Sequence, residues 1–404
     1  MSVGTPDLTT ARAALSRLFE PSDTAGLALV AAAGPVRALQ VASGEVPLTS
    51  GLIGETSRIL TAAGVSGQGY ALAEGLKRWR PRVADLAPQR DLDTIQRLGG
   101  QLLIPEDPRW PEALEHLELG MPLCLWARGN LAHGLPELER TVAVVGSRDA
   151  TGYGLSVTGD LSAGLANRGY TIISGGAYGI DAQAHRAALA GAAGAAAVAT
   201  IAVMACGSDR FYPAGNEDLL RSVAARGLIL SEVPPGSAPT RWRFLQRNRI
   251  IAALAAATVV VEARWRSGAL NTAHHAAALG REVGAVPGSV YSANSAGCHR
   301  LLRDGSAVCV TDAQEVAELA GPLSDTLQHD GVDGGAGPAA EHDGLTVEDL
   351  LLLDALPVRT GSTVDKLASV AGLSPPGVRA GLARLELEGL AIRSGPEQWR
   401  RGRR

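Results

Sequence analysis

The sequence predicts an α/β protein whose core is a doubly wound parallel sheet, with a helical domain before the sheet and a smaller domain of helices and a β-ribbon after it. The length of 404 residues exceeds one ordinary domain of about 100–200 residues. Between Thr141 and about Ala320, short β-branched runs alternate with Ala-rich helical patterns, as in a parallel sheet covered on both faces. Helical periodicity dominates the regions on either side.

Residues 1–88 are predicted to form the helical domain. Apolar residues recur at helical spacing from residue 8 to about 88, clearly in Ala11–Leu18 and Ile59–Leu72, with a break at Gly34-Pro35. Residues 89–320 are predicted to form the central domain. Its first part, up to Gly129-Asn130, is expected to be a lead-in that packs against the rest of the central domain.

The sheet itself is expected from seven short apolar runs separated by helices. The predicted strands are Val142–Val145, Thr171–Ser174, Thr200–Ala205, Leu228–Glu232, Thr258–Glu262, Glu282–Val286 and Ala307–Val310.

Residues 321–344, rich in Gly, Asp and Pro, show no periodicity and are predicted to be a flexible linker. Residues 345–404 follow as the last domain. Three short helices are expected at Leu345–Ala355, Ser362–Ala371 and Pro375–Gly389, before a terminal ribbon that starts near Leu390. Three helices and a ribbon predict a winged-helix-like unit.

Composition excludes several classes of protein. No run of about 18 apolar residues and no leader sequence is present, so we expect a cytoplasmic protein without a membrane partner. The four cysteines, Cys124, Cys206, Cys298 and Cys309, lack CxxC spacing, and we expect buried thiols rather than a disulfide framework or a metal site. The net charge of -4 does not indicate a nucleic-acid partner, because a local basic surface can be hidden in a whole-chain balance.

Ligands of a doubly wound sheet bind beyond the carboxyl ends of its strands, so the loops that follow the strands hold the candidate binding residues. The first strand leads into Gly146-Ser147-Arg148, where small residues let backbone N–H groups approach an anion and Arg148 adds a bidentate donor. The second leads into Ser174-Gly175-Gly176-Ala177-Tyr178-Gly179-Ile180-Asp181. Three glycines and a serine before a helix predict a phosphate cradle. A tight turn that binds nothing is the alternative.

The later loops are also small or basic. Gly207 clears space after the third strand, and Ser267-Gly268 opens a helix after the fifth. The segment Arg241–Arg249 is the densest basic and aromatic stretch, a composition suited to the phosphates and exposed bases of a nucleic-acid strand. Alternatively, Arg247 and Arg249 begin a helix and pair in the interior with Glu232 or Glu262.

Enzymatic functions find little support in the sequence. The first loop is not G-x-G-x-x-G and no Walker A sequence is present, so neither a dinucleotide nor ATP is expected as a cofactor. The histidines lack H-E-x-x-H spacing and no serine lies in G-x-S-x-G. Glu262 is expected to anchor arginines or backbone. We therefore expect no catalytic residue, no metal and no cofactor.

The residues just described, in their order and spacing, resemble the DNA-processing protein A (DprA/Smf) family over roughly residues 90–320. The motifs are Gly146–Arg148, Ser174–Asp181, Arg247–Ile251, Ser267-Gly268 and Val286–Gly288. The sequence departs from the family at Leu245, where proline is usual, and at His299, where asparagine is common.

The resemblance implies an extended Rossmann-like fold without catalysis. It also implies a homodimer that binds and protects single-stranded DNA and loads the RecA recombinase onto it, in recombination or natural transformation. By position, Arg148 resembles the phosphate-binding arginine, Arg241 a basic DNA contact and Phe244 the aromatic that contacts a base. The expected DNA-binding residues are Gly146, Ser147, Arg148, Ser174, Gly175, Gly176, Ala177, Gly179, Gly207, Arg241, Phe244, Arg247, Asn248, Ser267 and Gly268.

Two other functions are alternatives. A Rossmann-like nucleotide phosphoribohydrolase also uses a glycine-rich rim, but its P-G-G-x-G-T signature is absent, because Pro287-Gly288 continues as Ser289-Val290. A transcription regulator would use the last domain as its DNA reader, and the arginines there, such as Arg379 and Arg384, permit this.

Overall fold

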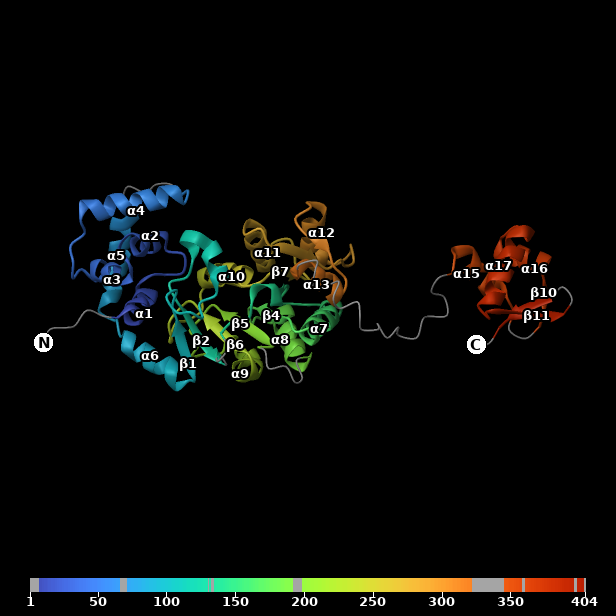
Figure 1. The fold of residues 1–404 in the computed structure, drawn as a ribbon, viewed down its shortest axis with the longest axis horizontal. Coiled ribbons are helices and arrows are strands. Elements are labelled where there is room, and N and C mark those ends of the chain that lie inside the picture. The colour runs from blue at the N-terminus through green and yellow to red at the C-terminus, as the bar shows by residue number, and fades with distance from the viewer. Residues whose placement is uncertain are drawn as a thin grey trace. The chain divides into compact units, whose positions relative to one another are not determined.

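The computed structural model describes residues 7–65, 71–129, 131, 134–191, 198–321, 345–357, 360–395 and 398–402. The chain divides into two compact units, residues 1–328 and residues 329–404 (Figure 1). The predicted linker, residues 321–344, lies outside the described residues except for Gly321. None of the helices in the described ranges is long and apolar enough to cross a membrane.

The first unit begins with helices, shown in blue in Figure 1. In the described residues these are α1 (Leu8–Leu18), α2 (Thr24–Ala33), α3 (Pro35–Ser43), α4 (Ser50–Ala62), α5 (Ala71–Val83) and α6 (Pro88–Arg97). Leucines and Trp79 form their core, with the Phe19 ring 4.4 Å from the Trp79 ring. The periodicity noted over Ile59–Leu72 spans the end of α4 and the start of α5, and residues 66–70 between them are not described. We call α1–α6 the N-terminal helical domain.

The sheet has the strand order β1-β2-β6-β5-β4-β3-β7-β8-β9 in the described residues. Its strands are β1 (Gly100–Leu103), β2 (Leu125–Gly129), β3 (Thr141–Val145), β4 (Thr171–Ser174), β5 (Thr200–Met204), β6 (Leu228–Ser231), β7 (Ala257–Val260), β8 (Glu282–Ala285) and β9 (Val308–Cys309). Strands β3 to β9 are parallel, in agreement with the predicted α/β class, and all seven lie at predicted positions.

The lead-in differs from its prediction. It does not only pack against the central domain but contributes two strands to the sheet. Strand β2 pairs antiparallel with β6, with Trp126 opposite Ser231, and β1 pairs antiparallel with β2. The Trp126 side chain is fully buried and its Nε1 donates to the Ser16 hydroxyl at 3.3 Å. Burial of this edge against the N-terminal helices explains why Leu102 and Trp126 are apolar.

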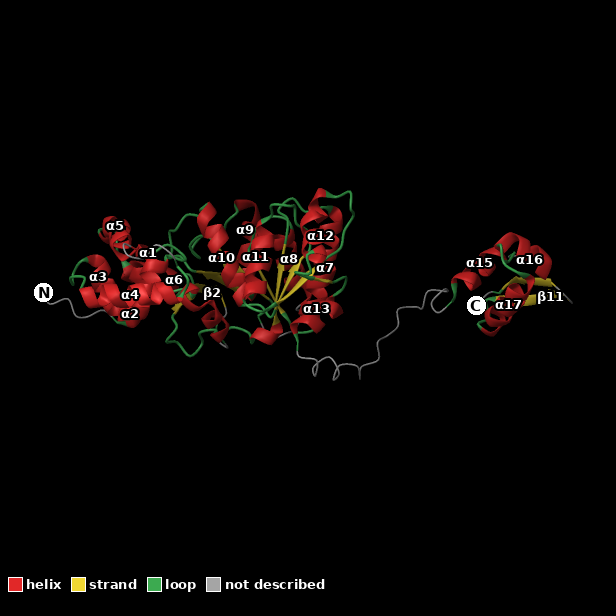
Figure 2. Cartoon of the chain, turned by 90° about the horizontal axis from the view of Figure 1, so that it is seen from above, coloured by secondary structure: helices red, strands yellow, loops and turns green. Residues whose placement is uncertain are grey.

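Helices cover both faces of the sheet, and Figure 2 shows the strands in yellow among them. They are α7 (Gly152–Asn167), α8 (Ile180–Gly191), α9 (Glu217–Arg226), α10 (Arg241–Ala253), α11 (Gly268–Ala278), α12 (Ala296–Arg303) and α13 (Ala313–Ala320). Alternate residues of β3 enter two cores: Val142 and Val144 pack with α7 and α8, and Ala143 and Val145 pack with α10 and α11. The chain order reverses at β3, which lies between β4 and β7, and such a reversal opens a crevice at the carboxyl ends of the strands.

The second unit contains α15 (Val347–Ala355), α16 (Val364–Ala371) and α17 (Pro375–Leu387), with a sheet of strand order β10-β12-β11. The strands are β10 (Ser362–Thr363), β11 (Ala391–Gly395) and β12 (Gln398–Arg401). Leu352, Leu382 and Leu385 form its buried core with Trp399. The helices lie where they were predicted, and the winged-helix-like character of the unit stays a prediction.

The cysteines differ from expectation at one position. Cys124, Cys206 and Cys298 are buried, and burial raises the pKa of Cys124 and Cys298 to about 12. Cys309 is exposed, because β9 forms the outer edge of the sheet.

Candidate functional site

A hollow of about 730 Å³ lies at the carboxyl ends of β3 and β7, where the strand order reverses. Its walls are the loop Gly146–Asp149 after β3, the loop Arg264–Ser267 after β7 and the first turn of α10. The first residues of α10 and α11 line it, so two helix N-termini with their partial positive charge face this space. We call this space the rim hollow.

Positive charge predominates in the rim hollow. Five arginines line it, Arg148, Arg241, Arg247, Arg264 and Arg266, against two aspartates, Asp149 and Asp181. Each aspartate has an arginine partner.

Asp149 is paired with Arg264 and accepts a hydrogen bond from the Ser147 hydroxyl at 2.6 Å. The Ser147 hydroxyl and the Arg264 guanidinium together hold the pKa of Asp149 below its ordinary value. Asp181 lies 3.8 Å from Arg247, but burial outweighs this pairing and raises the pKa of Asp181. The acidic groups of the hollow are therefore engaged with the protein's own cations and leave the other arginines free.

Three arginines are available to a ligand. Arg148, Arg241 and Arg266 are exposed, and within the described part of the chain their guanidinium groups have no hydrogen bond or ion pair. The Arg148 guanidinium lies over the Phe244 ring, 5.0 Å from its centroid. A planar cation on an aromatic face and two free cations beside it form a surface for a chain of phosphates.

Phe244 lines both the rim hollow and a second, smaller one of about 70 Å³. Met204, Cys206 and Tyr212 line this smaller hollow, and the Tyr212 ring centroid lies 6.0 Å from that of Phe244. Burial raises the pKa of Cys206 to about 11, so its thiol stays neutral. The apolar lining beside Phe244 suits a flat ring.

Two predicted contacts, Arg247 and Asn248, support the hollow from below. The Arg247 side chain is buried and donates to the carbonyl oxygens of Gly175 and Val203, both at 2.6 Å, and to Asn248 Oδ1 at 2.9 Å. Asn248 Nδ2 donates to the Gly268 carbonyl at 3.3 Å and to Asn271 Oδ1 at 3.1 Å. Both side chains thus hold the loops in place and have their polar groups occupied.

The loop Ser174–Gly179 serves internal packing more than the sequence suggested. The Ser174 hydroxyl is buried and donates to the Val144 carbonyl at 2.7 Å. Gly179 has a φ of 74°, and a Cβ atom there would lie 2.3 Å from the Ser147 carbonyl oxygen. A Cβ atom on Gly207 would meet Asp209 at 2.3 Å. Other parts of the protein approach the backbone closely at positions 179 and 207, and glycine is needed there because a side chain would clash with them.

The structure brings most of the predicted residues together. The rim hollow is lined by Gly146, Ser147, Arg148, Ala177, Arg241, Phe244, Arg247, Asn248, Ser267 and Gly268. Gly175 lines the smaller hollow. The remaining four, Ser174, Gly176, Gly179 and Gly207, line neither.

Sequence reasoning missed Tyr212, Arg264 and Arg266 as lining residues. Each follows a parallel strand, so the rule applied to the other loops could have found them. Arg249 is buried and pairs with Glu232 at 2.6 Å, which is the interior pairing considered from the sequence. Glu262 is buried and accepts from the Thr151 N–H and hydroxyl at 2.9 and 2.6 Å, so it anchors backbone as expected.

Proton-transfer and metal-binding groups are scarce in the described ranges. Burial lowers the pKa of His185 to about 3, and its Nδ1 lies 2.7 Å from the Thr200 hydroxyl. No group of three or more His, Cys, Asp or Glu side chains that could hold a metal ion occurs among the residues that the structure describes.

Comparison with known proteins gives consistent matches. The model of the family "DNA recombination-mediator protein A" matches residues 101–321. A Mycobacterium tuberculosis protein named putative DNA processing protein DprA is 42% identical over 389 residues, which are 93% of this chain and 90% of that protein. The DNA processing protein DprA of Bacillus subtilis is 36% identical over 238 residues, 59% of this chain and 74% of that one. The X-ray structure of DNA processing protein A from Streptococcus pneumoniae is similar with a TM-score of 0.58 and 30% identity, covering 75% of this chain and 95% of that one.

Substitution of Gly175 by alanine tests whether Arg247 holds the floor of the hollow. The new Cβ would lie 2.0 Å from Arg247 Nη1, so the guanidinium must leave its carbonyl acceptors. We expect a loss of about 1–3 kcal/mol in the free energy of unfolding, measured by denaturant titration. Gly152→Ala is the control, because nothing lies within 4 Å of its Cβ position. Equal stability of the two variants would contradict the role of Arg247.

Proposed function

The chain belongs to the DNA recombination-mediator protein A family, and from this premise we propose that it binds single-stranded DNA in the rim hollow without catalysing a reaction. Arg148 and Arg241 bind phosphates, with the helix N-termini adding to the potential, and Phe244 contacts a base.

The observation that carries this proposal is that Phe244 lines two different hollows. The free arginines Arg148, Arg241 and Arg266 line the larger hollow. The smaller hollow is lined mainly by apolar and aromatic side chains, and Arg148 is the one arginine among the described residues that borders it too. Phosphates need the first environment and an unstacked base needs the second. A duplex keeps its bases stacked inside the helix, whereas a single strand offers phosphate and base to adjacent hollows. The arrangement therefore favours single-stranded over duplex DNA.

Binding without catalysis is supported by the state of the acidic groups. Asp149 and Asp181 are the only carboxylates that line the rim hollow among the described residues, and both face arginines. Neither is placed to accept a proton from a ligand without losing its partner.

Removal of a free arginine should weaken binding in a salt-dependent way. Each phosphate contact releases counterions, so Arg148→Ala or Arg241→Ala should flatten the plot of log affinity against log salt by roughly 0.7 for a single strand. Oligonucleotide binding measured by fluorescence anisotropy across salt concentrations tests this. Arg168→Ala is the control, because Arg168 is exposed at the C-terminal end of α7. If neither rim variant changes the affinity, DNA binds elsewhere.

Removal of the Phe244 ring should have a different signature. Stacking of a base on an aromatic side chain contributes about 1–3 kcal/mol, so Phe244→Ala should weaken oligonucleotide binding by roughly 5- to 150-fold. The salt dependence should keep the slope of the unmodified protein, because no phosphate contact is lost. A variant that loses affinity only through a changed slope would indicate that Phe244 supports the arginines and does not contact a base.

The family resemblance also supports a place in recombination. We propose that the chain acts as a cytoplasmic homodimer, protects incoming or processed single strands and loads the RecA recombinase onto them. Adding the protein to strands coated with single-strand-binding protein should then speed RecA filament assembly, and Arg148→Ala should abolish this gain. Assembly at the same rate with and without the protein would exclude loading.

A further inference from the structure

The first turn of α10 presents two of the proposed DNA contacts, Arg241 and Phe244, yet lies outside the hydrophobic core. Side chains of residues 241–246 are exposed or half-buried, and the buried part of the helix begins at Arg247. Thr240 caps the turn by accepting from the Arg243 N–H at 3.2 Å. A helix end with few buried contacts opens readily. Contacts from outside the helix must hold this turn.

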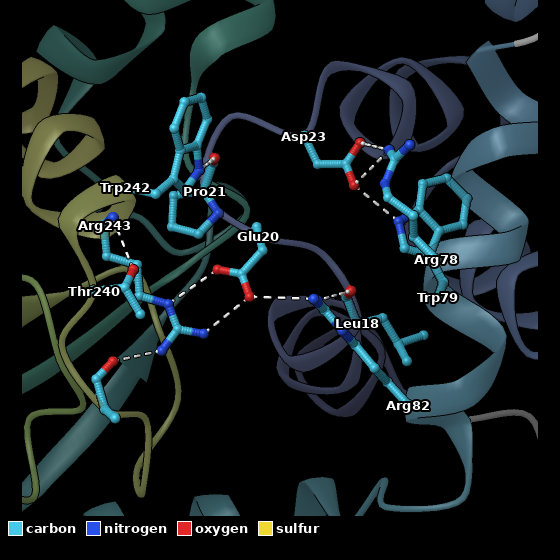
Figure 3. A network of polar contacts seen from close by, with 11 residues as sticks. Leu18, Glu20, Pro21, Asp23, Arg78, Trp79, Arg82, Thr240, Trp242 and Arg243 are labelled. Carbon is cyan, nitrogen blue, oxygen red and sulfur yellow. Dashed lines mark hydrogen bonds and ion pairs between the residues drawn. The ribbon is translucent and has the colours of Figure 1, made fainter.

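Those contacts come from the N-terminal helical domain (Figure 3). The Arg243 guanidinium donates two hydrogen bonds to the Glu20 carboxylate, from Nε at 2.9 Å and from Nη2 at 3.0 Å. Its remaining nitrogen donates to the Ala238 carbonyl at 2.7 Å. Beside it, Trp242 Nε1 donates to the Pro21 carbonyl at 3.1 Å. Neighbouring residues of α10 thus bind neighbouring residues of the segment between α1 and α2.

Glu20 lies in a segment that the N-terminal helical domain holds firmly. Arg82 approaches Glu20 Oε1 at 3.4 Å and donates to the Leu18 carbonyl at 2.8 Å. On the other side, Asp23 accepts from Trp79 Nε1 at 2.9 Å. Ser22 between them has a φ of 60°, a left-handed conformation that costs a non-glycine residue energy and persists where the surroundings fix it. Glu20 therefore offers a fixed point of attachment.

We infer that Glu20 is a positioning residue for the DNA site: through Arg243 it fixes the first turn of α10 so that Arg241 and Phe244 face the hollows. This inference rests on the proposed function. It gives the N-terminal helical domain a role in DNA binding that needs no contact between that domain and DNA.

Whether replacing Glu20 weakens or tightens DNA binding distinguishes a positioning role from simple charge repulsion. A carboxylate near a polyanion repels it, so removal of the Glu20 charge alone would tighten DNA binding. Loss of the anchor would instead release Arg241 and Phe244 and weaken binding. Glu20→Ala should therefore raise the dissociation constant for a single-stranded oligonucleotide roughly three- to tenfold, less than the full loss of a stacked base.

A double-mutant cycle identifies the partner. If Glu20 and Arg243 act as one pair, Glu20→Ala with Arg243→Ala should weaken binding no more than the worse single variant. If Arg243 contacts a phosphate itself, the two effects should differ in sign, and Arg243→Ala should flatten the salt dependence. Glu74→Ala is the matched control, because Glu74 is exposed on α5 and pairs with Lys77 of the same helix. This control should leave the affinity unchanged.

Hydrogen exchange of the DNA-free protein tests the anchor without reference to function. In Glu20→Ala the hydrogen-bonded amides of residues 243–246 should exchange faster, with those of 248–253 unchanged. Should the alanine variant fail to fold, Glu20→Gln keeps the side-chain volume and should show the same changes in smaller measure. Unchanged exchange would overturn the anchor.

The outcomes also distinguish this inference from the proposed function. If Arg148→Ala and Arg241→Ala leave DNA binding intact, the rim is not the DNA site and both conclusions fall. If these variants lose affinity while Glu20→Ala binds as tightly as the unmodified protein or more tightly, the proposed function stands and the positioning role is wrong.

Discussion

The buried guanidinium of Arg247 is the interaction on which the candidate site depends. Burial lowers the pKa of Arg247, and an unpaired charge at this depth would be strongly destabilising. The carbonyl oxygens of Gly175 and Val203, the Asn248 amide and the Asp181 carboxylate satisfy it together. These partners belong to different strand ends and helices. The arginine therefore fixes the relative positions of the loops that form both hollows, and Gly175 must lack a side chain to make room for it.

Burial decides which arginines hold the structure and which are available to a ligand. Arg247 and Arg249 lie inside and hold structure, whereas Arg148, Arg241 and Arg266 lie at the surface of the rim and remain available. The two acidic groups of the hollow are likewise engaged, Asp149 by Arg264 and Asp181 by Arg247. A chain with a net charge of -4 thereby presents a local cationic surface, which whole-chain composition does not reveal.

The sequence was sufficient for the parallel sheet, because buried strands are β-branched runs and the loops after them are rich in small residues. It also placed Arg148, Arg241 and Phe244 on one rim, since strand ends of a parallel sheet meet at one edge. The sequence could not tell that Arg247 is a buried structural residue and Arg148 an exposed one, because both are arginines in segments that follow strands. Strands β1 and β2 were missed since their antiparallel pairing depends on contacts with distant residues, such as Trp126 with Ser16.

The departure at Leu245 bears on how the aromatic contact is presented. A helix that begins at Arg241 needs the N–H of residue 245 for its own backbone bonding, and proline would remove that donor and crowd the preceding turn. With leucine there, the chain is helical from Arg241 onward, and the Phe244 N–H donates to the Thr240 carbonyl at 3.0 Å. This first turn lies outside the hydrophobic core and carries Trp242 and Arg243, which donate to the Pro21 carbonyl and the Glu20 carboxylate. The helical first turn and its attachment to the N-terminal helical domain therefore belong together, since a turn with few buried contacts keeps one conformation for a ligand only when other residues hold it.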